Sequence, residues 1–171
     1  MPFLKSLGYV ALIGILAHVV GEALPRKWFR WERFPYASWK WEKKGKIYDR
    51  LCIRAWKDCL PDKSRYVKRM VPKRVGSCPT SASVYRLVRE TCVAETVHFC
   101  LCLLAFPIYF FWRNGVGVFL TLLFVFCNLP FMMLQRYNRP ALVELGARLE
   151  KREERRRNAH TDSIGEHGRR S

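Results

Sequence analysis

The sequence has seven cysteines but lacks any C-x-x-C pair, the spacing that zinc cages and many redox sites use. The number of cysteines is also odd, so we predict neither a disulfide framework nor a zinc site. Cys100 and Cys102 lie on different faces of any regular helix and cannot chelate a metal together. We interpret the cysteines as small packing residues.

Acidic residues are scarce: 14 Asp and Glu stand against 31 Lys and Arg, which gives a net charge of +17. Such a charge can indicate nucleic-acid binding, but the basic residues are unevenly distributed. They gather between Leu24 and Cys92 and again after Leu134, whereas the start of the chain carries only Lys5. Segments of this kind are attracted to anionic lipid headgroups. We therefore expect a membrane bilayer as partner and no nucleic acid.

Charge is almost absent from three long apolar runs, although half of all residues are hydrophobic. The runs lie in residues 1–24, 93–112 and 115–134. About 20 apolar residues in a helix cross a hydrocarbon core of roughly 30 Å. The sequence therefore predicts an all-α membrane protein with about three transmembrane helices. The two-residue break between the second and third runs predicts a tight antiparallel hairpin.

The two basic segments, 25–92 and 135–171, must lie on one side of a membrane crossed three times. Basic loops favour the cytoplasmic side, so we predict a multi-pass protein of the cell membrane with this loop and tail in the cytoplasm. The first run reads as an uncleaved anchor because His18 and Glu22 disturb a small-residue cleavage site. Removal as a signal peptide is the alternative.

Within the basic loop, an aromatic and basic stretch over 26–41 is typical of a segment that lies along the bilayer surface. Apolar residues at helical spacing predict an amphipathic interfacial helix over 47–60, ended by Pro61. A further helix begins with Ser81 or Ser83 as its cap and continues in phase into the second span. Pro107 should kink that span. The tail from Glu150 reads as a solvated helical end that frays into disorder.

All three predicted spans carry polar residues at the same depth in the membrane, where burying such residues is energetically unfavourable. Glu95 and His98 are three residues apart, so both can point from one helix face into a bundle. His18 and Glu22 end the first span, and the third ends near Asn128 and the polar residues 135–139. We predict one pocket at the cytoplasmic interface, to which Glu95, His98 and Arg136 contribute. The alternatives are structural: a buried hydrogen-bonded pair, and arginines that anchor a helix end to phosphates.

Four segments of the chain resemble the glycosyl-4,4'-diaponeurosporenoate acyltransferase family of staphyloxanthin-type carotenoid biosynthesis. They are Trp41-Glu42-Lys43-Lys44-Gly45-Lys46-Ile47-Tyr48, Ile53-Arg54-Ala55-Trp56-Lys57-Asp58, Glu90 through His98, and Asn128-Leu129-Pro130 through Gln135-Arg136-Tyr137-Asn138-Arg139-Pro140. The similarity runs in order from about Gly21 to Glu150. Gln-Arg-Tyr-Asn-Arg-Pro after a span is its most specific part.

The resemblance implies transfer of a fatty acyl chain to a sugar hydroxyl of a glycosylated carotenoid or similar glycolipid at the membrane. In this reading His98 is the general base, and Glu95 or Glu90 orients its imidazole. The expected substrate-binding residues are Arg136, Tyr137, Asn138, Arg139, Glu90, Trp56, Lys57 and Asp58. We expect no metal or other cofactor; the acyl donor, such as acyl-CoA or an acyl-carrier protein, is a co-substrate.

Two other classes remain open. Glu-x-x-His also occurs in di-iron helix bundles, where His18 and Glu22 could complete the ligands of a metal-dependent membrane enzyme. A non-catalytic membrane adaptor that binds anionic lipid is the other alternative. The sequence leaves the donor, the acceptor and the oligomeric state open.

Overall fold

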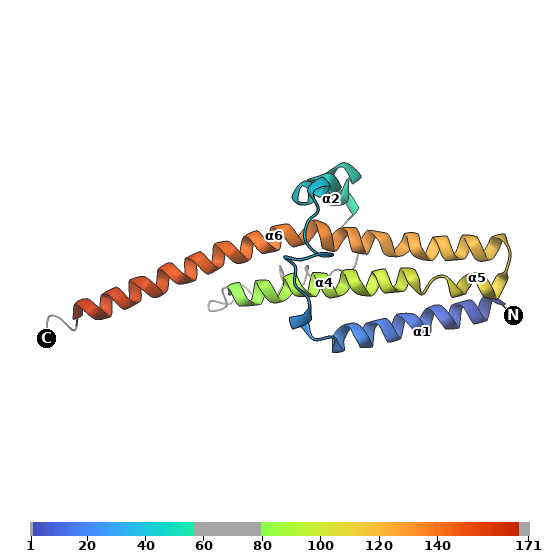
Figure 1. The fold of residues 1–171 in the computed structure, drawn as a ribbon, viewed down its shortest axis with the longest axis horizontal. Coiled ribbons are helices and arrows are strands. Elements are labelled where there is room, and N and C mark those ends of the chain that lie inside the picture. The colour runs from blue at the N-terminus through green and yellow to red at the C-terminus, as the bar shows by residue number, and fades with distance from the viewer. Residues whose placement is uncertain (1, 57–79, 168–171) are drawn as a thin grey trace.

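The computed structural model describes residues 2–56 and 80–167, and the described residues form helices without strands (Figure 1). The elements are α1 (Pro2–Ala23), the 3-10 helices η1 (Arg26–Trp28) and η2 (Lys40–Leu51), α2 (Ile53–Trp56), α4 (Ser81–Leu103), α5 (Pro107–Trp112) and α6 (Gly115–His167). Three stretches are long and apolar enough to cross a membrane: Pro2–Ala23, Ser81–Trp112 and Gly115–Thr161. The predicted all-α fold with three spans is confirmed.

The helices α1, α4 and α6 lie side by side, with the N-terminus and the turn between α5 and α6 at the same end (Figure 1). The end of α1, the start of α4 and the extension of α6 lie toward the opposite end. Helix α1 leaves large apolar side chains more than half exposed, among them Phe3, Leu4, Leu7, Ile15 and Val19. Hydrocarbon side chains in such numbers suit a lipid-facing surface.

The helix that contains the third span does not end at Leu134, because α6 continues without a break to His167. Pro130 and Pro140 both lie inside this helix. Its second half is braced by the start of α4. The amide and hydroxyl of Ser81 donate to the Glu153 carboxylate at 2.9 and 2.6 Å. The helical end predicted for the tail therefore belongs to one long helix that also forms the third span.

The helix of the second span has a different cap from the two predicted, and at Pro107 it is interrupted rather than only kinked. Thr80, rather than Ser81 or Ser83, is the cap of α4, and its hydroxyl accepts the amide of Ser83 at 3.3 Å. At the other end the predicted kink is a full interruption. Helix α4 ends at Leu103, residues 104–106 form turns, and Pro107 opens α5. Proline is well suited to a first helical turn because it has no amide hydrogen to leave unpaired.

The prediction of a single amphipathic helix over 47–60 was wrong for the described part of that range, residues 47–56. There η2 ends and α2 begins, separated by Cys52, whose left-handed φ of 51° stops the first helix. Residues 57–60 lie outside the described residues. The apolar face nevertheless packs as a helix face would: Tyr48 and Ile53 are buried against Leu134 of α6.

Candidate functional site

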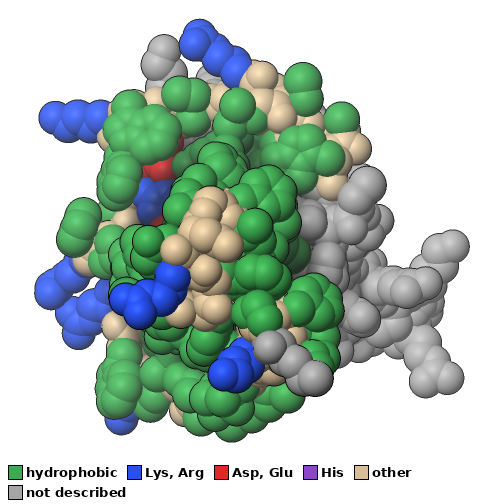
Figure 2. Space-filling model, turned by 90° about the vertical axis from the view of Figure 1, so that its right-hand side faces the viewer, with side chains coloured by type: hydrophobic (Ala, Val, Ile, Leu, Met, Phe, Trp, Pro, Cys, Tyr) green, Lys and Arg blue, Asp and Glu red, His purple; other side chains and the backbone are tan. Residues whose placement is uncertain are grey.

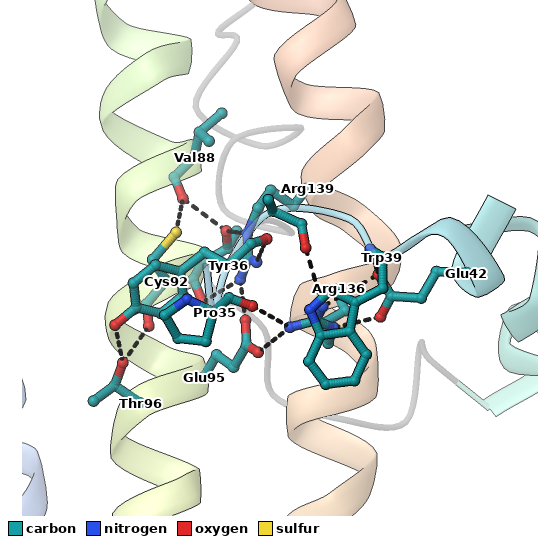
Figure 3. Close-up of polar contacts among 12 residues, drawn as sticks. Pro35, Tyr36, Trp39, Glu42, Val88, Cys92, Glu95, Thr96, Arg136 and Arg139 are labelled. Atoms are coloured by element: carbon teal, nitrogen blue, oxygen red, sulfur yellow. Dashed lines mark hydrogen bonds and ion pairs between the residues drawn. The ribbon is translucent and has the colours of Figure 1, made fainter. Parts of the chain in front are cut away.

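Two arginines of α6 and two glutamates form an ion-pair network where η2 meets the spans (Figure 3). Arg136 Nε lies 2.5 Å from Oε1 of Glu42, and its Nη1 lies 2.5 Å from Oε1 of Glu95 on α4. Arg139, one turn later on α6, pairs with Oε2 of the same Glu95. Glu95 therefore bridges both guanidinium groups, and the network holds two positive and two negative side chains.

The same two arginines hold residues 34–39, the aromatic segment that precedes η2, against the helix bundle. Arg136 donates to the carbonyls of Pro35 at 3.1 Å and Ala37 at 3.3 Å, and its guanidinium lies 4.7 Å from the Trp39 ring centroid. Arg139 donates to the carbonyl of Tyr36 at 2.6 Å. The stretch predicted to lie along the bilayer surface is thus fastened, over residues 35–39, against the bundle itself.

All five N–H groups of Arg136 are in use. Nε and one Nη2 hydrogen go to Glu42, one Nη1 hydrogen goes to Glu95, and the other two go to the carbonyls of Pro35 and Ala37. A guanidinium group has five donors and no more. Arg136 therefore supplies positive potential and holds the segment, and it has no spare donor for a substrate in this arrangement.

The network is buried. Glu42 is 2 % exposed, Arg139 4 % and Glu95 7 %. Burial raises the pKa of the Glu42 carboxyl, but hydrogen bonds from Arg136, from the Tyr48 hydroxyl at 2.7 Å and from the Trp39 amide at 2.9 Å outweigh it. The pKa of Glu42 is consequently lowered, so its carboxylate is ionised at neutral pH. Burial and the bond to Glu42 raise the pKa of Tyr48, which stays a neutral donor.

A pocket of about 460 Å³ lies between the aromatic segment and the helices α4 and α6. Its walls are mainly apolar, and the polar groups of Glu42, Glu95 and Arg136 contribute to its lining. The other lining residues are Phe34, Pro35, Tyr36, Trp39, Trp41, Tyr48, Thr96, Phe99, Leu129, Met132 and Met133. Seen from the end that carries the turn between α5 and α6, the surface is largely hydrophobic, and a small acidic area lies recessed among those side chains (Figure 2).

His98 is bound by an amide rather than by a carboxylate. Its Nδ1 lies 2.9 Å from Oδ1 of Asn128, and the imidazole stacks on the Phe131 ring at a centroid distance of 4.6 Å. The Asn128 amide nitrogen donates to the carbonyl of Phe124 at 2.9 Å, so Oδ1 is the acceptor that faces His98. The network therefore assigns the proton of a neutral His98 to Nδ1 and the lone pair to Nε2, the form that can accept a proton.

The predicted pairing of Glu95 with His98 was wrong, because the Glu95 carboxylate binds Arg136 and Arg139. Residues three apart on a helix differ by about 60° in direction. Helix α6 presents arginines opposite Glu95 and the amide of Asn128 opposite His98. The common cavity predicted for Glu95, His98 and Arg136 also needs correction, since Glu95 and Arg136 line the pocket and His98 is not among its lining residues.

Glu90 does not orient the imidazole either. Its carboxylate accepts two bonds from Arg26, at 2.8 and 3.0 Å, while the same guanidinium binds the carbonyls of Gly21, Glu22 and Leu24 at the end of α1. The bond to Glu90 is the main cause that raises the pKa of Arg26. This pair fastens α1 to α4, away from the pocket lining.

The remaining predicted site residues are dispersed. Tyr137 packs against the buried cluster of Tyr48, Ile53 and Leu134, Asn138 is partly buried, and Trp56 donates to the Leu51 carbonyl at 3.0 Å. Lys57 and Asp58 lie outside the described residues. Tyr137, Asn138 and Trp56 are not among the residues that line the pocket.

The residues considered as possible metal ligands do not come together in the structure. His18 is exposed on α1, and Glu22 forms an ion pair with Arg26 at 3.7 Å. Across residues 2–56 and 80–167, no three side chains of His, Cys, Asp or Glu come together as a metal site would require.

Sequence reasoning missed Glu42 and the aromatic residues Tyr36, Trp39 and Tyr48 that surround the network. Glu42 is the only acidic residue among residues 33–48, a basic and aromatic stretch, and this isolation is the signal that could have found it. An isolated carboxylate among aromatic side chains needs a cationic partner when it is buried. The partner lies 94 positions away in the sequence.

The chain is similar in sequence to one known protein family. Residues 25–148 match the glycosyl-4,4'-diaponeurosporenoate acyltransferase family. The protein of that name from Staphylococcus aureus strain bovine RF122 / ET3-1 is 28 % identical over 142 residues, which cover 80 % of this chain and 82 % of the relative. The strain N315 protein is 27 % identical over the same shares. No solved structure matches the chain significantly. Since the match covers more than half of the sequence, the chain belongs to the glycosyl-4,4'-diaponeurosporenoate acyltransferase family and is an acyltransferase.

Proposed function

We propose that the protein is an integral enzyme of the cell membrane that transfers a fatty acyl chain to a sugar hydroxyl of a glycosylated carotenoid or a similar glycolipid. The observation that carries this proposal is the pocket between α4, α6 and the aromatic segment, with apolar walls and a charged edge. An acyl chain requires such walls, whereas a thioester and a sugar require polar surroundings. The names of the relatives, which specify acyl transfer and a glycosylated carotenoid acid, support the same reaction.

The acyl chain would lie along the aromatic and methionine side chains of the pocket. The buried pairs around Arg136 hold the pocket's shape and supply a fixed field at its polar edge, which is how preorganised charges assist a reaction. The loop and the tail are cytoplasmic in this proposal, so a water-soluble acyl donor reaches the pocket from the cytoplasm.

His98 is the general base in this proposal. Its Nε2 takes the proton of the acceptor hydroxyl, and the hydroxyl oxygen attacks the carbonyl carbon of an acyl thioester. The new C–O bond forms as the C–S bond breaks, and the released thiolate takes up a proton. What supports the role is the hydrogen bond between Nδ1 and Asn128, which leaves Nε2 as the ring nitrogen that can accept a proton. His98 directly precedes the lining residue Phe99 on α4, so in this proposal the sugar would meet it at the side of the pocket.

The test is lipid profiling of a host that carries the wild type, His98→Ala or His18→Ala. His18 is an exposed histidine of α1 and serves as the matched control. We expect the acylated product to fall by about 10²-fold or more with His98→Ala, as for loss of a positioned base, and to persist with His18→Ala. Identical profiles for all three would favour a non-catalytic adaptor. If His98→Ala retains the acylated product and a folded Glu95→Gln variant loses it, the general base is a residue of the pocket rather than His98.

A further inference from the structure

The part of α6 that packs beside the start of α4 carries a row of basic side chains on its opposite face. Arg148, Lys151, Arg152 and Arg155 follow the spacing i, i+3, i+4 and i+7, which places them along one side of a helix. All four are exposed, and the Arg148 side chain is 75 % exposed. We call these four residues the basic stripe. Its charge is only partly offset, by an exposed pair between Arg148 and Glu144 at 2.5 Å.

Contacts on the opposite face hold the basic stripe outward. Glu150 accepts the Tyr85 hydroxyl at 3.1 Å, Glu153 accepts two bonds from Ser81, and Gly146 lies against the Tyr85 ring. These α6 residues lie on the side of the helix that faces the start of α4. The acidic residues of this part of α6 are thus used partly for packing, whereas the stripe points away from the bundle.

The basic stripe lies too far along α6 to act as a headgroup anchor. Leu134 ends the apolar run, and Arg148 follows it by fourteen positions, or roughly 21 Å of helix at about 1.5 Å per residue. The headgroup layer adds only about 5–8 Å on each side of the hydrocarbon core. In Figure 1 the extension continues in much the same direction as the span rather than turning back along it. The stripe therefore faces the aqueous phase.

We propose that the basic stripe is the docking surface for a small acidic protein that carries the acyl chain as a thioester. The inference rests on the proposed function, for which it names the donor class. A single exposed helix is convex, whereas small ligands bind in concave sites, so a row of charges here suits a macromolecular surface rather than a free nucleotide. Complementary charge on the partner would steer its approach and orient it.

The distance from the basic stripe to the pocket suits a carrier protein that delivers its acyl chain on a flexible arm. Arg148 follows Arg136 by twelve positions, so roughly 18 Å of helix separates the near end of the stripe from the pocket edge. A carrier held at the stripe keeps its own surface in water while its arm places the thioester at the pocket. The reaction is the one already described: the acceptor oxygen replaces sulfur on the acyl carbon, and the carrier leaves as a free thiol.

The experiment compares two donors with the same palmitoyl chain, one on acyl carrier protein and one on coenzyme A, using full-length protein in nanodiscs. The test variant replaces Arg148, Lys151, Arg152 and Arg155 by Gln. The control replaces four exposed basic residues elsewhere, Lys27, Arg30, Arg33 and Arg86, and so makes the same change in net charge. With the carrier-linked donor we expect KM to rise about tenfold in the test variant with kcat unchanged, and the salt dependence of kcat/KM to weaken. Kinetics with palmitoyl-coenzyme A should be the same as in the wild type.

Each other outcome overturns the proposal. An equal rise of KM for both donors would mean that the stripe binds phosphate groups of the donor. Lost binding to phosphatidylglycerol vesicles with unchanged carrier kinetics would make it a lipid-binding surface. If the wild type transfers no acyl chain from any donor, the proposed function fails, and direct binding of acyl carrier protein to wild type and variant still decides whether the stripe is a docking surface.

Discussion

Arg136 and Glu42 stand 94 positions apart in the sequence and meet with Nε and Oε1 at 2.5 Å, which joins the third span to a segment outside the bundle. Glu95 on α4 binds the same guanidinium. One arginine therefore ties together three parts of the chain, and its removal would leave two buried carboxylates without that partner.

We expect Arg136→Ala to lower the free energy of unfolding by about 3–5 kcal/mol, because uncompensated buried charge is left behind. Thermal unfolding of the purified protein in detergent measures the change. Arg148→Ala is the matched control, since the exposed pair of Arg148 with Glu144 contributes at most about 1 kcal/mol. Equal effects of the two substitutions would contradict the structural role of the network.

The lowered pKa of Glu42 predicts loss of stability in acid. A carboxyl whose pKa is lower in the folded than in the unfolded protein stabilises the fold above its ordinary value of 4.5. That contribution is lost as the pH falls through this value toward the folded pKa. We expect the wild-type Tm to drop as the pH falls below about 5, by more than that of Glu42→Gln, since Gln cannot titrate. If Tm falls in parallel with pH for the two proteins, ionised Glu42 does not contribute to stability in this way.

Gly146 is required by the contact between α6 and α4. A Cβ at this position would lie 2.9 Å from Cε1 of Tyr85, whose ring also stacks on Trp31 at 5.4 Å. We expect Gly146→Ala to lower Tm despite the better helix propensity of alanine. Gly14→Ala is the control: no atom lies within 4 Å of a Cβ there, so the Tm should be unchanged or slightly higher.

The position of Asn128 predicts a role in activity through His98. Asn128→Leu removes the acceptor for Nδ1–H, so we expect kcat to fall by up to about 10²-fold, part of what a positioned base contributes. Asn128→Asp keeps an acceptor oxygen and should retain more activity than the leucine variant. Equal losses with both, at unchanged Tm, would exclude this positioning role.

Filling the pocket should alter the preference for acyl chain length. Met132→Trp adds volume to the lining, so transfer of long chains should decrease more than transfer of short ones when donors of graded length are compared. Phe126→Trp is the control, because Phe126 is 64 % exposed and does not line the pocket. A uniform decrease for all chain lengths would show that the chain binds elsewhere.

The candidate site was only partly predictable. Glu95, His98, Arg136 and Arg139 were recognised because ionisable residues at the ends of apolar runs are costly and therefore conspicuous. The pairing of these residues, and the role of Glu42, could not be found in this way. Glu42 and Arg136 are 94 positions apart in the sequence. Asn128 binds His98 because the packing of α6 against α4 brings the two side chains together.

The sequence by itself determined the three apolar spans, the hairpin and the family, since length, hydropathy and short motifs are local properties. The tertiary structure decided how the polar residues are paired. It turned an expected acid–histidine pair into separate contacts, Glu95 with two arginines and His98 with Asn128. The physical reason is that a buried charge or hydrogen-bonding group binds the complementary group that packing places nearest, and that choice depends on helix orientation rather than on sequence spacing.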